Sequence, residues 1–221
     1  MEIIYSSEPV DAAAVHLARN IKARLDAGER VVWLLSGGSS IKVVLETANL
    51  LADTDLTNLS ATLSDERYGN IGHADENWQQ LLDGGLRLPG ADLYRPLTNN
   101  DRSTTSREFS AWVEQKISTA DYTIGLFGIG GDGHTAGIKP HSSAIETTAW
   151  AIDYTGDDFE RITITTHAIN HVDEAIIKAS GDDKIPALKR LLHQDIPFSE
   201  QPAQALKLIP KCTLYTNNRE L

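Results

Sequence analysis

The sequence predicts an α/β protein with a mostly parallel, Rossmann-like sheet that carries helices on both faces. Three observations point to this class. Short apolar runs, such as Val-Val-Trp-Leu-Leu at residues 31–35, have the continuous hydrophobic character of strands that are covered on both sides. Segments with apolar residues at helical spacing alternate with these runs. Glycine-rich segments follow two of the runs, at the strand ends where ligands bind in such sheets.

The first half of the chain supplies three strands and two helices. An apolar stretch at residues 2–5 predicts a strand. Residues 11–26 are expected to form a helix, since apolar residues recur there at the spacing of one helix face and Gly28 follows as a capping residue. The other elements expected here are a strand at 31–35, a helix at 39–51, and a strand at 59–63 followed by a long polar loop.

The second half continues the alternation. Residues 103–117 are expected to form a helix, with Phe109, Val113 and Ile117 on one side. The other elements expected here are strands at 121–127, 147–152, 161–165, 175–179 and 213–215, and a helix at 182–192. The sequence contains no repeat and no clear linker, so a single domain is expected over residues 1–221.

The charge balance excludes several function classes. Lys and Arg total 20 against 31 Asp and Glu, which gives a formal net charge of -11. Nucleic acids and anionic membrane surfaces require an excess of cations, so neither is an expected partner. A single small anion remains possible, because a few cations focused in one cleft can bind it.

The single cysteine and the start of the sequence indicate in which cellular compartment the protein is expected. The only cysteine, Cys212, lies in an apolar stretch and is expected to be a buried structural thiol. The sequence starts without the pattern of a secretory signal, and its apolar runs are short. A cytoplasmic location is therefore expected.

The segment Ser36-Gly37-Gly38-Ser39-Ser40 lies between a predicted strand and a predicted helix. Adjacent glycines let a backbone approach a ligand closely, and a helix N-terminus offers free N–H groups to an anion. The segment is a sensible phosphate cradle, although a glycine turn with a serine cap would have the same sequence.

A second charged segment, Ser64-Asp65-Glu66-Arg67, follows the strand predicted at 59–63. The rigid guanidinium of Arg67 could grip a phosphate. Asp65 and Glu66 could hold Arg67 or bind sugar hydroxyls, and residues 75–78 could fold back over the site. The alternative is an ordinary solvated loop.

The third segment, residues 128–136 (Gly-Ile-Gly-Gly-Asp-Gly-His-Thr-Ala), contains a GxGxxG pattern after a strand. A dinucleotide fingerprint needs a long helix at once, and Pro140 arrives too soon for one. We expect instead a tight turn that places Asp132 beside His134, where the carboxylate can orient the imidazole as a base. His167 and His171 are spaced for a helical metal site but lack a third ligand, so no metal site is predicted.

Together these segments resemble the 6-phosphogluconolactonase family, within the larger group that includes glucosamine-6-phosphate deaminase. The similar segments, in chain order, are 36–39 (the SGGS phosphate loop), 65–67 (the DER motif), 75–77 (a D-S-N motif), 128–136 (the GxGxDGHTA signature), 161–165 (an R-[VI]-T-x-T strand) and 180–184 (a G-x-x-K segment). These motifs in order make a specific pattern, and the GxGxDGHTA signature is the most specific of them.

The resemblance implies a sugar-phosphate isomerase/CoA-transferase-like fold and hydrolysis of 6-phosphoglucono-δ-lactone to 6-phosphogluconate in the pentose phosphate pathway, with no cofactor and no metal. It implies that His134 activates water and that Asp132 orients the imidazole. The residues expected to bind the substrate and its phosphate are Gly37, Gly38, Ser39, Ser40, Asp65, Arg67 and Lys184. A monomer or small homo-oligomer is expected, acting on a small phosphorylated sugar lactone.

The chain departs from the family pattern at Tyr68, Gly137 and Lys139, which leaves the lactone preference open. Lys139 is an extra cation near the expected site. Amino-sugar-phosphate isomerases/deaminases typically carry a glutamate at its position, which disfavours that alternative function. A non-catalytic sugar-phosphate-binding protein on the same fold is a further alternative, against which an intact Asp132–His134 pair argues.

Overall fold

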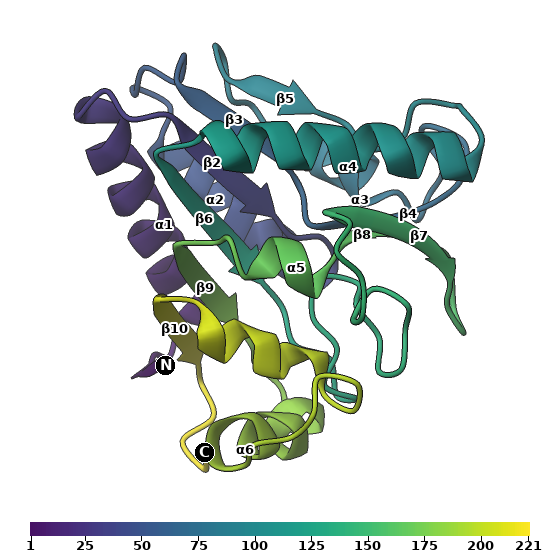
Figure 1. Ribbon diagram of the computed structural model, residues 1–221. Helices are drawn as coiled ribbons and strands as arrows, with labels where there is room; N and C mark the ends of the chain where they lie inside the picture. The colour runs from purple at the N-terminus through teal and green to yellow at the C-terminus, as the bar shows by residue number, and fades with distance from the viewer.

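The protein is built on two sheets, as the computed structural model of all 221 residues shows (Figure 1). The main sheet has seven parallel strands in the order β1-β10-β9-β6-β2-β3-β5. Its strands are β1 (Glu2–Tyr5), β2 (Val31–Leu35), β3 (Leu59–Leu63), β5 (Asp92–Tyr94), β6 (Tyr122–Phe127), β9 (Glu174–Lys178) and β10 (Lys211–Thr216). The smaller, antiparallel sheet has the order β4-β8-β7, with β4 at Asp65–Arg67, β7 at Ala151–Thr155 and β8 at Glu160–Ile164.

Helices cover both faces of the main sheet. One face carries α1 (Pro9–Asp26), α2 (Ile41–Leu50) and α3 (Asn77–Asp83), whose buried side chains join one apolar core. The other carries α4 (Arg102–Thr119), α5 (Thr166–Ile169), α6 (Ile185–His193) and the 3₁₀ segment η3 (Pro202–Leu208), which join a second core. Two short 3₁₀ turns, η1 (Gly38–Ser40) and η2 (Asp182–Lys184), precede α2 and α6.

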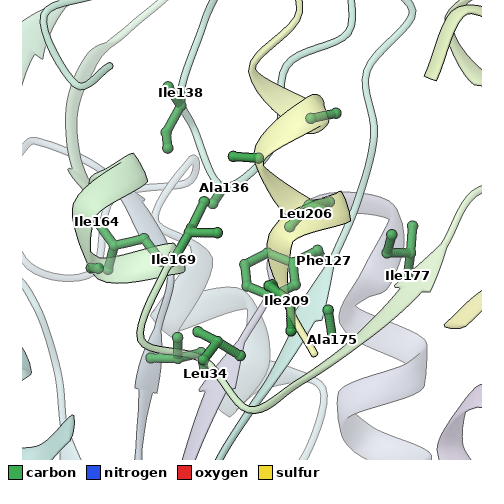
Figure 2. Packing of buried hydrophobic residues seen from close by; sticks show 14 of the residues in the cluster. Leu34, Phe127, Ala136, Ile138, Ile164, Ile169, Ala175, Ile177, Leu206 and Ile209 are labelled. Atoms are coloured by element: carbon green, nitrogen blue, oxygen red, sulfur yellow. The ribbon is translucent and has the colours of Figure 1, made fainter. Parts of the chain in front are cut away.

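Strand β2 shows why a central strand of this sheet can be apolar throughout. Val32 and Leu34 point into the core under α4, while Trp33 and Leu35 point into the core under α1 and α2. Successive side chains of a strand alternate between faces, so a strand covered on both sides needs apolar residues at every position. Figure 2 shows Leu34 in the second core, with Phe127 of β6, Ile169 of α5 and Leu206 of η3.

The order of the strands fixes where a ligand can bind. From β2 the chain crosses to β3 on one side, and from β6 it crosses to β9 on the other side. The loops that leave β2 and β6 therefore diverge, and a crevice opens between them at the carboxyl ends of these two adjacent strands. The glycine-rich segments 36–40 and 128–136 both begin at this point.

The predicted fold class is confirmed, while several elements differ from expectation. The long polar loop predicted after β3 contains β4, α3 and β5, and α5 and η3 were not predicted. The strand expected at 147–152 lies at Ala151–Thr155 instead, and it pairs with β8 in the small sheet rather than joining the main one. Cys212 is buried, as expected. No helix is both long and apolar enough to cross a membrane.

A buried carboxylate pins α1 to the main sheet. Glu174, at the start of β9, lies 3.0 Å from His16 Nε2, accepts hydrogen bonds from Asn20 Nδ2 at 2.8 and 2.9 Å, and accepts another from the Tyr122 hydroxyl at 2.5 Å. Burial works to raise the pKa of Glu174, but these hydrogen bonds prevail and lower it to about 2.

We expect Glu174→Gln to lower the free energy of unfolding by on the order of 2–3 kcal/mol at pH 7. Folding lowers the pKa of Glu174. Its ionised carboxylate therefore stabilises the folded protein fully above the pKa of the unfolded chain, about 4.5, and this stabilisation is lost as the pH falls towards 2. Urea unfolding at pH 7 and pH 3 would therefore show a smaller difference at pH 3. Glu46→Gln, on the exposed side of α2, is the control. An equal loss at both pH values would contradict this account.

Candidate active site

Most of the predicted site residues line one cleft, which has a volume of about 340 Å³. Its walls come from the loops that follow β2, β3, β6 and β9, together with the turn between β7 and β8. The volume lies in the range of sites for small molecules. Only three of its 20 lining residues are hydrophobic, so the cleft suits a polar ligand.

The segment after β2 forms one wall of the cleft with Gly37, Gly38, Ser39 and Ser40. It leads through η1 directly into α2, so its backbone N–H groups lie at the N-terminal end of a helix, where they attract anions. A Cβ atom at Gly37 would come within 2.2 Å of the Asn77 side chain. Only glycine therefore fits at Gly37 beside the start of α3.

Two cations that form no ion pair line the same cleft. Lys184 reaches it from η2. The Arg67 guanidinium donates to the backbone carbonyl of Asp75 at 2.9 Å and lies 5.0 Å from the centre of the Phe159 ring. Neither Asp65 nor Glu66 pairs with the Arg67 guanidinium: Asp65 pairs with Arg161, and Glu66 contacts only the backbone N–H of Arg67.

Glu66 instead organises the backbone around the cleft. Its fully buried carboxyl accepts N–H groups from Arg67 at 2.8 Å, from Asn77 at 2.7 Å and from Trp78 at 2.9 Å. Burial raises the pKa of Glu66 to about 8, and the three donors oppose that rise. The first two residues of α3 are thereby fixed to β4, which places Asn77 against Gly37.

Asp65 pairs with an arginine that the sequence reasoning did not select. Arg161 of β8 is 5% exposed, and it lies 3.6 Å from Asp65 Oδ2 and 2.8 Å from Asp158 Oδ2. All three residues line the cleft. The charge of Arg161 is thus largely compensated within the protein, whereas Arg67 and Lys184 have charge available for a ligand.

His134 and Asp132 form a close pair in the loop after β6. The Asp132 carboxylate lies 2.6 Å from His134 Nδ1 and also accepts the backbone N–H of His134 at 3.0 Å. Burial works to raise the pKa of Asp132, but these hydrogen bonds and the nearby charges of His134 and Lys139 hold it well below its ordinary value. An ionised Asp132 accepts a hydrogen bond from Nδ1–H, which leaves Nε2 as the unprotonated nitrogen of a neutral imidazole.

The imidazole rests against bare backbone. A Cβ atom at Gly130 would come within 2.2 Å of the His134 ring, so glycine is required there for the ring to lie flat against the loop. The chain runs from Gly137 to Pro140 without forming a helix, which agrees with the rejection of a dinucleotide fingerprint. Asp153, the residue that such a fingerprint would use, pairs with Arg102 at 2.8 Å.

The structure brings nearly all of the predicted site residues to one cleft. Those that line it are Gly37, Gly38, Ser39, Ser40, Asp65, Arg67, His134 and Lys184. Asp132 lies outside the lining and contacts His134 from behind. Asn77 also lines the cleft, and it lies in the segment 75–78 that was expected to fold back over the site. Sequence reasoning missed Asp158, Phe159 and Arg161 as lining residues. The signal for Arg161 was present, since it falls in a segment that resembles a family motif.

Lys178 was also missed. It ends β9, and its Nζ donates to the Ser39 carbonyl at 3.5 Å, beneath the segment that carries the two glycines. Burial lowers the pKa of Lys178, and the charges of Lys184 and Lys42 add to this effect. Lys178 therefore adds positive charge beside the segment that carries the two glycines.

Comparisons with known proteins agree with the geometry. The family described as "Glucosamine-6-phosphate isomerases/6-phosphogluconolactonase" matches residues 6–213. A 6-phosphogluconolactonase of Neisseria meningitidis is 26% identical over 81% of this chain and 81% of its own length. One from Chlamydia pneumoniae is 23% identical over 73% of this chain, which spans only 64% of that relative's length.

A solved structure carries the same fold. The 6-phosphogluconolactonase of Thermotoga maritima superposes with a TM-score of 0.82, covering 97% of each chain at 19% sequence identity. The likeness in fold and the family match over nearly the whole chain lead to one conclusion. This chain belongs to the glucosamine-6-phosphate isomerase/6-phosphogluconolactonase family.

Proposed function

We propose that this protein hydrolyses 6-phosphoglucono-δ-lactone to 6-phosphogluconate, a step of the pentose phosphate pathway. One observation carries the proposal. A single cleft holds an anion-binding glycine segment with unpaired cations and, on another of its walls, an imidazole oriented by a carboxylate. The substrate has the matching pair of groups, a phosphate and an ester carbonyl at opposite ends of a sugar.

The phosphate end of the substrate binds at the segment after β2. Backbone N–H groups of Gly37 and Gly38 and the hydroxyls of Ser39 and Ser40 donate to the phosphate oxygens, while Arg67 and Lys184 supply positive charge. Asp65 and Arg161 are already paired with each other. They therefore serve to shape the cleft and to contact sugar hydroxyls.

The chemistry takes place at His134. Its Nε2 accepts a proton from water while the water oxygen attacks the lactone carbonyl and forms a tetrahedral intermediate. Collapse of this intermediate breaks the bond between the carbonyl carbon and the ring oxygen, and the imidazolium returns its proton to that oxygen. Asp132 keeps the imidazole in the required tautomer and stabilises its cationic form. Anchoring the distant phosphate orients the carbonyl for this attack.

The family also contains amino-sugar-phosphate isomerases, and the fold does not distinguish the two activities. Deamination in that group is associated with a glutamate where this chain has Lys139, which favours lactone hydrolysis. Three further expectations belong to this proposal as predictions: a single domain over residues 1–221, a monomer or small homo-oligomer, and a cytoplasmic location, with which the buried free thiol of Cys212 is consistent.

The proposed reaction is tested with a panel of substrates. Hydrolysis of a lactone releases acid, so freshly prepared 6-phosphoglucono-δ-lactone can be followed by pH-stat titration. We expect rapid acid release with this lactone, slow release with the unphosphorylated lactone, and no ammonia from glucosamine 6-phosphate. Equal rates with both lactones would remove the role of the phosphate, and ammonia release would establish the deaminase alternative.

The role of His134 is tested by His134→Ala. Loss of a general base of this kind lowers kcat by on the order of 10²–10⁴-fold. The affinity for the product, measured by calorimetry with 6-phosphogluconate, is expected to stay nearly unchanged, because the phosphate contacts are intact. Turnover at the wild-type level would refute the assignment of the base.

The role of Arg67 is tested by Arg67→Met, which keeps the length of the side chain and removes its charge. We expect KM to rise about tenfold or more with little change in kcat, since one charge-assisted hydrogen bond contributes roughly 1.5–3 kcal/mol. Arg107→Met is the matched control, because Arg107 lies on the exposed side of α4. An unaltered KM in Arg67→Met would count against phosphate binding by this residue.

A further inference from the structure

Lys139 departs from the family pattern, and it occupies a defined position beside the cleft. Its Nζ lies 3.5 Å from Asp132 Oδ2, 3.3 Å from Asp157 Oδ1 and 3.5 Å from Asp158 Oδ2. Its side chain is only 18% exposed. It does not line the cleft, so it is not the additional ligand-binding cation that the sequence suggested.

Through these contacts Lys139 links the Asp132–His134 pair to the Asp158–Arg161 pair. Asp132 also contacts the ring of His134, and Asp158 also binds Arg161. Basic and acidic side chains therefore alternate without a break from the His134 imidazole to the buried Arg161 guanidinium. Lys139 is the only cation between the two carboxylates of this series.

Lys139 also fastens the turn between β7 and β8. Asp157 and Asp158 lie in this turn, which is closed by the backbone hydrogen bond from Gly156 to Phe159 at 2.8 Å. Phe159 lines the cleft, with its ring 5.0 Å from the Arg67 guanidinium and 5.6 Å from that of Arg161. By fixing the β7–β8 turn, Lys139 also keeps the Phe159 ring near Arg67 and Arg161.

We propose that Lys139 is a positioning residue, which fixes the carboxylate of Asp132 behind His134, sets the proton affinity of that imidazole and fastens the β7–β8 turn to the cleft. Its importance for turnover rests on the proposed function, in which His134 is the base. Its effect on the imidazole does not rest on that function, because it follows from distance and charge alone.

The charges around Lys139 and His134 determine in which direction Lys139 changes the protonation of the imidazole. Lys139 faces Asp132, Asp157, Asp158 and the Tyr154 hydroxyl, and His134 faces Asp132. The other charged groups at the cleft are Asp65, Arg67, Arg161, Asp183 and Lys184. Removing the charge of Lys139 leaves His134 beside an uncompensated carboxylate, so protonation of the imidazole becomes easier and its pKa rises.

The test compares wild type with Lys139→Met, which keeps the side-chain length, and with Lys139→Arg, which keeps the charge. The pKa of the His134 ring is measured by NMR titration of the full chain, with His134→Asn identifying its signal. The pH dependence of kcat/KM is measured on 6-phosphoglucono-δ-lactone. We expect Lys139→Met to raise the ring pKa and the acid limb of the rate profile by about half a unit to one unit. Lys139→Arg should stay close to wild type.

Lys116→Met is the matched control, because Lys116 is a partly buried lysine paired with Asp92 away from the cleft. It should leave both measurements unchanged. An unmoved ring pKa in Lys139→Met overturns the proposal, and a uniform loss of rate that accompanies an unmoved ring pKa is a merely structural effect. If the ring pKa shifts and the rate profile does not follow, the role of Lys139 stands and His134 as the base is refuted. Should Lys139→Met fail to fold, Lys139→Gln provides the same comparison.

Discussion

The site depends on one constraint, which is that β2 and β6 lie side by side and parallel while the chain leaves them in opposite directions. This arrangement brings two glycine-rich segments, nearly a hundred residues apart in sequence, to the same edge of the sheet. The two strands are held in register by cores on both faces of the sheet, to which their alternating side chains contribute. A rigid, doubly covered sheet thus places the glycine segment after β2 and the imidazole of His134 at a fixed separation.

Charge is distributed unevenly over this scaffold. The chain carries a formal net charge of -11, yet Arg67 and Lys184 line the cleft without ion pairs, and Lys178 contacts the Ser39 carbonyl in the wall of the cleft. Arg161 differs from them, because the carboxylates of buried Asp65 and of Asp158 compensate its charge. An acidic protein can therefore offer a small, local positive potential to one anion while its surface repels larger polyanions. The cleft does not contradict the net charge, because the cations that serve it are few and close together.

The sequence was most informative where local chemistry decides the structure. The strands at 31–35 and 59–63 were predicted at their observed bounds, because each is a short, mostly buried run of a central strand, apolar throughout in the first case and mostly apolar in the second. Strands β4 and β5 and helix α3 were missed, since each is short and takes its stability from distant partners, such as the antiparallel pairing of β4 with β8. The same limit applies to Arg161 and Lys139. Their identities were visible in the sequence, but their roles arise from carboxylates that only the tertiary fold brings near them.

In the proposed function one ligand spans the cleft, with its phosphate at the glycine segment and its reacting carbon at His134. A crystal structure of the protein with 6-phosphogluconate would show whether a ligand binds in this way. We expect phosphate oxygens within hydrogen-bonding distance of the backbone N–H groups of Gly37 and Gly38 and close to Arg67 and Lys184. We also expect the new carboxylate within hydrogen-bonding reach of His134 Nε2. A product bound in the reverse orientation, or with its carboxylate remote from His134, would contradict this proposal.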